Sequence, residues 1–111
     1  MRAEFIDPGA FRHELMLEEA TRTPDGSGGH VVEWTEVGTL FARVEPISAT
    51  GRFGADQMLE NVTHRITMRW RSDLLSGMRL RRMERAFEII TVHDPDETGR
   101  YLVCRVREEG L

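Results

Sequence analysis

The sequence contains no lysine, a single cysteine and no long hydrophobic run, and the last two of these shortages each exclude a class of protein. Because Cys104 has no second cysteine to pair with, the chain forms no intramolecular disulfide, thiolate zinc cluster or Cys-x-x-Cys redox pair. The first residues lack the apolar stretch that a secretory signal or a membrane span requires. We therefore expect a chain that stays in a reducing compartment and has no membrane partner.

The chain has a small excess of acidic residues, and its basic residues are of one kind. All 15 basic residues are arginine, against 19 acidic residues, which gives a net charge of −4. This average argues against a surface built entirely for non-specific nucleic-acid binding and leaves a local basic patch open. A length of 111 residues is enough for one hydrophobic core, so we expect a single domain over residues 1–111.

Strict alternation of apolar and polar residues over residues 62–71 predicts a strand with one buried face. On that face we interpret His64 as a hydrogen-bonded core or interface histidine and Trp70 as a core or interface residue. Residues 39–47 alternate likewise. Further strands are predicted over residues 14–18, 30–37, 78–81, 87–92 and 101–107. This pattern favours an all-β fold, a small antiparallel β-barrel of about six to seven strands.

Two internal segments are expected to lie outside the strands. Residues 21–30, with several glycines, are predicted to form a flexible loop. Residues 48–61 are predicted to be a mobile loop or one short helix, because residues 53–61 contain helix formers in a run too short to be stable alone.

No group of residues has the spacing of a catalytic, cofactor or metal site. The four histidines are widely separated, and residues 94–99 resemble the start of a calcium loop whose twelfth position is Arg105 instead of a bidentate glutamate. Cys104 alternates with apolar residues and has no identifiable base, which favours a small buried side chain over a nucleophile. We therefore expect neither an enzyme nor a bound cofactor or metal.

Arginine is distributed unevenly along the chain. Residues 1–60 contain eleven acidic residues and five arginines, whereas residues 64–85 contain seven arginines and two acidic residues. Arg65, Arg69 and Arg71 lie opposite the apolar face of their strand, which predicts a basic outer face. That face is either a solvated barrel exterior or a surface that meets acidic protein or DNA phosphate. One functional alternative is therefore an oligonucleotide-binding β-barrel in which these arginines and Trp70 line a groove.

Five runs of sequence, in this order, resemble the head–tail joining proteins of tailed bacteriophages, also called head closure or stopper proteins. The runs are WTEV (34–37), ARVEPIS (42–48), VTHRITMR (62–69), GMRL (77–80) and FEI (87–89). The chain departs from the family in residues 82–85, which lack the glycine of a tight turn. It also has a longer N-terminal extension than the family, and residues 1–11 are therefore expected to form an N-terminal arm that reaches a neighbour. The lysine-free composition also suits a phage-like particle of the gene-transfer-agent kind.

The resemblance implies a structural neck protein of a virion, made in the bacterial cytoplasm, that forms a homo-oligomeric ring of six or twelve copies. The ring lies beneath the portal or adaptor protein, helps to retain the packaged double-stranded DNA, and offers a docking surface to the tail terminator or tail tube protein. The channel-closing loop of the family maps onto Ser48, Gly51, Arg52, Phe53, Gly54, Asp56 and Gln57. Protein contacts are predicted at Glu45, Thr63, Arg65, Thr67, Arg69, Arg71, Arg79 and Arg81.

Overall fold

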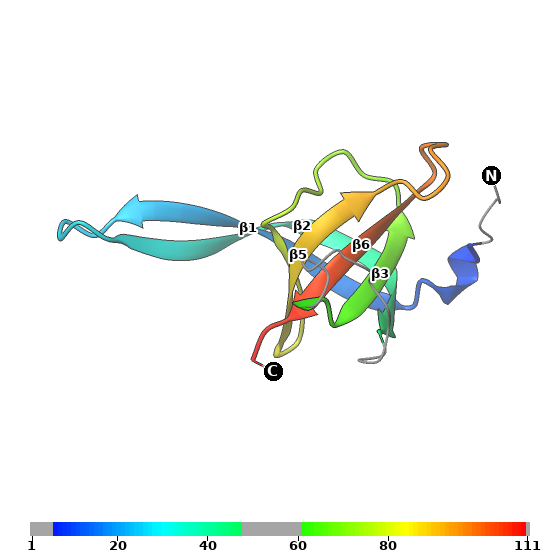
Figure 1. Ribbon diagram of the computed structural model, residues 1–111, viewed down its shortest axis with the longest axis horizontal. Coiled ribbons are helices and arrows are strands. Elements are labelled where there is room, and N and C mark those ends of the chain that lie inside the picture. The colour runs from blue at the N-terminus through cyan, green and yellow to red at the C-terminus, as the bar shows by residue number, and fades with distance from the viewer. Residues whose placement is uncertain (1–5, 48–60, 111) are drawn as a thin grey trace.

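The computed structural model describes residues 6–47 and 61–110, which form one antiparallel sheet closed into a barrel (Figure 1). The strands are β1 (His13–Pro24), β2 (His30–Pro46), β3 (His64–Arg69), β4 (Arg79–Arg82), β5 (Arg85–His93) and β6 (Tyr101–Glu108), preceded by a 3₁₀ turn, η1 (Pro8–Ala10). Around the barrel the order is β1, β2, β3, β6, β5, β4, and β4 closes the sheet against β1. The predicted all-β class is confirmed.

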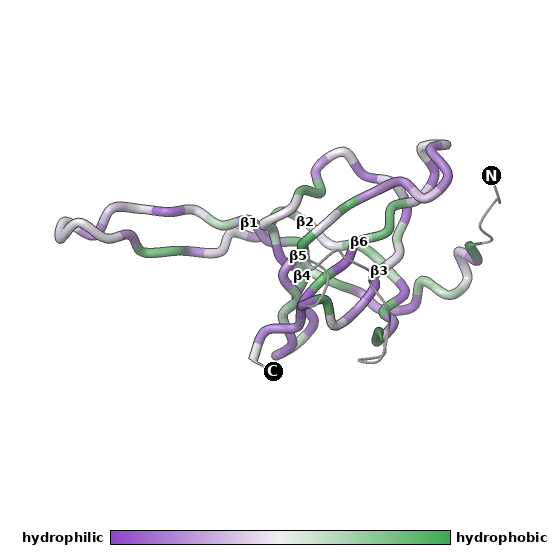
Figure 2. Tube along the Cα trace, viewed as in Figure 1, coloured by the Kyte–Doolittle hydropathy of each residue, from purple (hydrophilic) through white to green (hydrophobic). Residues whose placement is uncertain are grey.

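The core fills the barrel interior with alternate residues of the strands. In β3 the predicted alternation holds, and His64, Ile66 and Met68 are buried. Leu17 and Leu80, which lie opposite each other on β1 and β4, are fully inaccessible to solvent. Each such leucine contributes about 1.5–3 kcal/mol through the apolar surface it removes from water. The hydrophobic segments of Figure 2 accordingly lie mostly within the barrel strands.

Trp70 does not belong to this core, and the expectation that it shares the buried face of β3 is wrong. Strand β3 ends at Arg69, and the backbone N–H of Trp70 donates to the carbonyl of Arg100 (2.9 Å). Beyond that bond the chain turns away from the sheet, which leaves Trp70 47% exposed.

Strand β2 combines two strands that the sequence predicts separately, over residues 30–37 and 39–47. The register explains the difference: Leu17 pairs with Gly38 while Glu18 pairs with Glu36, so Val37 is an extra residue in β2. A β-bulge of this kind shifts the alternation by one residue without ending the strand.

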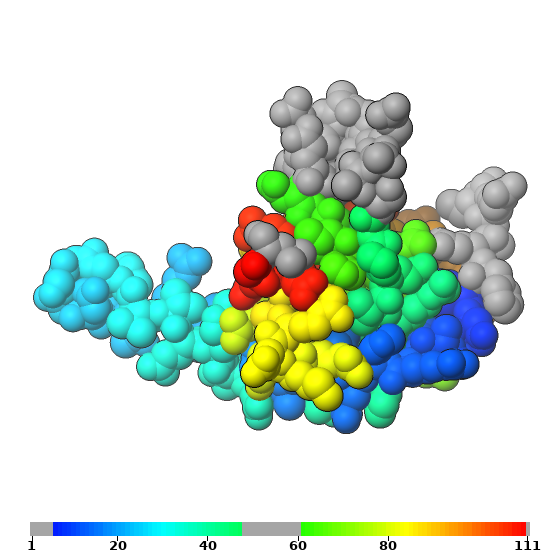
Figure 3. All heavy atoms as spheres, turned by 90° about the horizontal axis from the view of Figure 1, so that it is seen from below, coloured from blue at the N-terminus to red at the C-terminus, as the bar shows by residue number. Residues whose placement is uncertain are grey.

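The longest departure from the predicted loops is a hairpin that projects from the barrel (Figures 1 and 3). The sequence predicts a flexible loop over residues 21–30, but β1 continues to Pro24 and β2 begins at His30. The connection is therefore limited to residues 25–29, where the carboxylate of Asp25 accepts from the backbone N–H groups of Ser27 and Gly29. We call residues 19–36 the projecting hairpin.

The turn over residues 82–85 is tight despite its lack of glycine. Arg82 pairs with Arg85, so two residues connect β4 to β5. Met83 adopts a φ of 55°, the left-handed region that costs a side-chain-bearing residue about 1–2 kcal/mol.

Candidate protein-interaction surfaces

A buried ion cluster fixes the base of the projecting hairpin to the barrel. Glu18 is 4% exposed, and its carboxylate accepts from Nε of Arg79 (2.6 Å) and from Nε of Arg81 (3.1 Å). The guanidinium of Arg79 also lies over the ring of Trp34, 4.2 Å from its centroid. We call Glu18, Trp34, Arg79 and Arg81 the anchor cluster. It connects both hairpin strands to β4.

Electrostatics in the anchor cluster favour the charged carboxylate. Burial acts to raise the pKa of Glu18, but the hydrogen bonds and charges of Arg79 and Arg81 together lower it below its ordinary value of 4.5. Both arginines were predicted as contacts to other proteins, and the structure places their Nε groups on a carboxylate of the same chain.

The outer face of β2 and β3 also contains ion pairs within the chain. Glu45 accepts from Nε of Arg65 (3.2 Å) and forms an ion pair with Arg43 (3.1 Å). On the same face Thr67 is 6% exposed, and residues of the N-terminal segment, Phe11 among them, line a small hollow with it. Residues 6–11 of the predicted arm thus lie against the chain's own barrel, where Phe11 packs edge-on against Tyr101 with ring centroids 5.9 Å apart.

His64 is a hydrogen-bonded core histidine, as its position on the apolar face predicts. Its Nδ1 lies 2.8 Å from Oγ1 of Thr63, and its ring packs edge-on against Phe87. Burial lowers the pKa of His64, with Glu108 acting to raise it and Arg85 to lower it, so the imidazole is neutral at pH 7. Thr63, a predicted interface residue, accepts the backbone N–H of Glu108 (2.7 Å) and so has a structural role.

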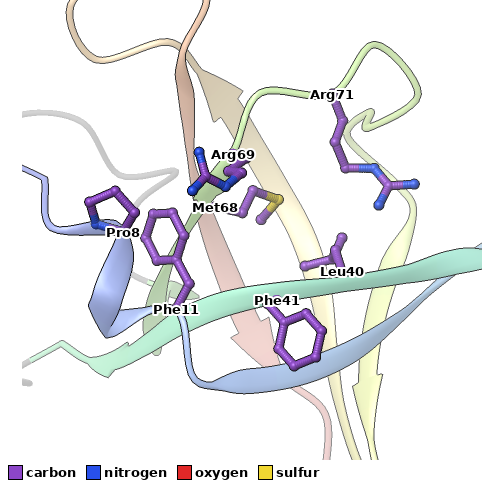
Figure 4. A pocket seen from close by; sticks show the side chains of 7 residues that line it. All are labelled: Pro8, Phe11, Leu40, Phe41, Met68, Arg69 and Arg71. Atoms are coloured by element: carbon purple, nitrogen blue, oxygen red, sulfur yellow. The ribbon is translucent and has the colours of Figure 1, made fainter.

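A partly apolar hollow opens where β2 and β3 separate (Figure 4). The two strands pair no further than Ala42 and Met68, and beyond that pair the guanidinium of Arg71 bridges them by donating to the carbonyl of Thr39 (2.9 Å). The hollow measures about 390 Å³, and we call it the β2–β3 hollow. It is lined by Pro8, Phe11, Leu40, Phe41, Met68, Arg69 and Arg71.

The two arginines of the β2–β3 hollow differ in their partners. Arg71 forms a two-pronged ion pair with Asp73, with both N–O distances at 2.9 Å. Arg69 is exposed and has no ion-pair partner among the described residues. Phe41, on the rim, is 57% exposed.

The predicted sites are thus only partly brought together. The predicted channel-closing residues, Ser48 to Gln57, lie outside the described residues. The arginines proposed for an oligonucleotide groove do not converge, because the β2–β3 hollow contains Arg69 and Arg71 but neither Arg65 nor Trp70. Carboxylates of the chain also neutralise Arg65 and Arg71. The projecting hairpin and Phe41 were not predicted as sites.

The described residues provide no metal-binding cluster of His, Cys, Asp or Glu. In the loop over residues 94–99, Asp94 accepts from the backbone N–H groups of Asp96, Glu97 and Gly99, so it organises its own turn. Cys104 is fully buried. No helix in the described part of the chain is long and apolar enough to cross a membrane.

The described part of the chain thus forms a closed β-barrel whose surface carries paired arginines, a projecting hairpin and a partly apolar hollow. A family model described as phage head completion protein matches residues 6–109, and the chain belongs to this family. The predicted resemblance to phage head–tail joining proteins is confirmed.

Relatives of known source agree with this assignment. The head completion protein gp7 of Enterobacteria phage HK97 is 32% identical over 75 residues, which cover 68% of this chain and 67% of gp7. A chain from the virion of a native gene transfer agent particle has 31% identity and a TM-score of 0.66, over 88% of this chain and 93% of that chain. These findings place the chain in the virion neck as a head completion protein.

The fold occurs in a further solved structure. Protein SF1141 from Shigella flexneri 2a superimposes with a TM-score of 0.65 over 91% of this chain and 96% of that chain, at 24% identity. At this identity the likeness concerns the fold alone.

Proposed function

We propose that the chain forms a homo-oligomeric ring beneath the portal or adaptor protein and has a structural, not an enzymatic, role. In this proposal the ring, of six or twelve copies, helps to retain the packaged double-stranded DNA and gives the tail terminator or tail tube protein a surface to bind. The observation that carries the proposal is the head completion family match, which spans residues 6–109 and therefore the whole barrel.

The surface chemistry supports protein contacts over contacts with nucleic acid. Five of the seven arginines in residues 64–85 form ion pairs with carboxylates of the same chain, as Arg65 does with Glu45 and Arg79 with Glu18. Among the predicted interface residues, Arg69 keeps an exposed charge without an ion-pair partner in the described part of the chain. Phe41, which lines the same β2–β3 hollow, is exposed. A lone cation and an exposed aromatic ring at one hollow are typical of a protein interface.

Removing the gene from a producing strain tests the role as a whole. We expect heads that package DNA but lose it and have no tails, and we expect the wild-type gene supplied in trans to restore tailed particles. Normal tailed, DNA-filled particles without this chain would refute the proposal.

Two variants separate the parts of the role. Deleting residues 51–57 should yield particles with assembled necks that leak DNA, and normal DNA retention would remove the channel-closing loop from the proposal. Reversing the charges of Arg65 and Arg69 should prevent neck assembly. The control is Arg107→Glu, which alters an exposed residue whose partner is Glu88. Infectious or gene-transferring particles from the double variant would refute the assignment of this face as an interface.

A further inference from the structure

The projecting hairpin is an ordered element that the barrel does not need. Outside the barrel neither of its strands has a second neighbour among the described residues, since β1 pairs with β4 only over residues 16–18 and β2 with β3 only over 42–46. A two-stranded ribbon is marginally stable in water by itself. Here the anchor cluster holds its base, and strand-forming Thr and Val residues continue to its tip. Along the projecting hairpin, both outer edges therefore lack a strand partner among the described residues.

The two faces of the hairpin differ in chemistry. Because residues opposite each other in the register share a face, Ala20 and Trp34 lie on one side, where the guanidinium of Arg79 covers the indole ring. The other side contains two carboxylates and no basic residue. We call it the acidic face, and it consists of Glu19, Thr21, Thr23, Val31, Glu33 and Thr35.

The acidic face has no partner in the described part of its own chain. Neither Glu19 nor Glu33 forms an ion pair with a described residue, and Val31 is 48% exposed. Figure 2 shows the hydrophobic segment of β2 out on the hairpin, away from the barrel. The surface that fits this face must combine a free cation with apolar side chains.

The β2–β3 hollow has that combination. Arg69 supplies a cation without a carboxylate partner among the described residues, and Phe11 and Phe41 supply apolar walls. The hairpin cannot reach the hollow of its own chain, because Val31 and Phe41 lie ten residues apart on one strand, about 33 Å of extended backbone. The hairpin and the η1 side of the hollow lie toward opposite ends of the long axis in Figure 1, so the hollow of a second copy is within reach.

We infer that the acidic face of the hairpin docks in the β2–β3 hollow of a second copy of this chain, with Val31 against Phe41 and Glu33 beside Arg69. The contact joins two different surfaces head to tail, the kind of interface that closes into a ring when the rotation between copies permits. Opposite charge sets the register of the contact, and the apolar side chains supply the buried area. The inference rests on the proposed ring and adds its interface.

Cysteine cross-linking in assembled particles tests the contact directly. Particles are prepared with the double variant Val31→Cys and Phe41→Cys and treated with a short bismaleimide. A cross-link between these positions must join two copies, because the linker cannot span 33 Å within one strand. The native Cys104 is fully buried and does not compete. The control replaces Phe41→Cys by Leu75→Cys, which is 64% exposed and lies outside the hollow.

The expected result is a ladder of covalent multimers of this chain from the Val31/Phe41 variant and only monomer from the Val31/Leu75 variant. Particles that contain the chain but give no ladder, or that link it to a protein of another size, would overturn the inference and leave the proposed function intact. Absence of the wild-type chain from purified particles would instead refute the proposed function.

Exchange of the charges gives a second test that needs no cysteine. Glu33→Arg alone and Arg69→Glu alone should each lower the amount of chain per particle several-fold, and the two changes together should restore it. Both positions are exposed, so each variant is expected to fold. If the double variant is as depleted from particles as the single variants, Glu33 does not pair with Arg69.

Discussion

Replacing Glu18 with glutamine removes the charge from the anchor cluster and keeps the shape of the side chain. Glu18 is 4% exposed and receives hydrogen bonds from Arg79 and Arg81. Removing one partner of a buried ion pair costs about 3–5 kcal/mol, because the remaining charge is left without compensation. Here Arg79 and Arg81 keep secondary contacts with Glu109 (3.6 Å) and Glu36 (3.8 Å). We therefore expect a loss at the lower end of that range, about 3 kcal/mol.

The matched control is Glu88→Gln. Glu88 pairs with Arg107 at 2.6 Å, the same distance as Glu18 to Arg79, but its side chain is 35% exposed instead of 5%. An exposed pair of this kind is worth at most about 1 kcal/mol. Urea unfolding of both variants at pH 7 measures the two losses. Equal losses would refute the reasoning, because Glu18 is far more buried than Glu88 and pairs with two arginines where Glu88 pairs with one.

The stabilisation by Glu18 should also depend on pH in a defined direction. Because the pKa of Glu18 is lowered in the folded chain, its stabilisation is present above 4.5, the ordinary value, and is lost as the pH falls through the lower folded pKa. The difference in unfolding free energy between wild type and Glu18→Gln should be constant from neutral pH to about pH 5 and should shrink below that. A difference that persists undiminished in acid would show that the charge of Glu18 is not the cause.

Three further predictions concern single residues. Burial raises the pKa of the Cys104 thiol to about 12, so a disulfide reagent should label it only after unfolding, and rapid labelling of the native chain would contradict its burial. Burial lowers the pKa of His64, so its titration midpoint measured by NMR should lie below 6.5. Because the unfolded chain then takes up a proton more readily than the folded chain, folding stability should fall as the pH drops below 6.5. A midpoint above 6.5 would contradict this prediction. Met83→Gly should stabilise the chain by up to about 1 kcal/mol, because glycine relieves the positive φ. The control, Glu84→Gly, should destabilise the chain by about 0.5–1 kcal/mol. If thermal unfolding shows that both substitutions change the stability in the same direction, Met83 is not strained.

Sequence patterns predicted the parts of the fold that have one buried face. β3 was predicted because alternation of apolar and polar residues reports burial on one side, and His64 was placed correctly by the same rule. Trp70 was misplaced because alternation continues one residue beyond the end of the strand. The bulge at Val37 interrupted the alternation, so one strand was predicted as two.

The β1 half of the projecting hairpin escaped prediction for a related reason, whereas residues 30–37 on β2 were predicted as a strand. Residues 19–24 are exposed on both faces, so the sequence shows no contrast between a buried and a solvated side. The anchor cluster joins Glu18 to residues 61 and 63 positions further along the chain, a pairing that no local pattern reveals. The concentration of arginine over residues 64–85 can be counted in the sequence. The carboxylates that pair with several of these arginines come from other strands, such as Glu45 on β2 and Glu18 on β1, and no local pattern predicts those pairs.

A reconstruction of the neck from purified particles would show directly where this chain lies. We expect a ring of copies of this barrel between the portal or adaptor and the tail, with each projecting hairpin lying on the neighbouring copy. A neck whose density between portal and tail has no room for this six-stranded barrel would contradict this expectation.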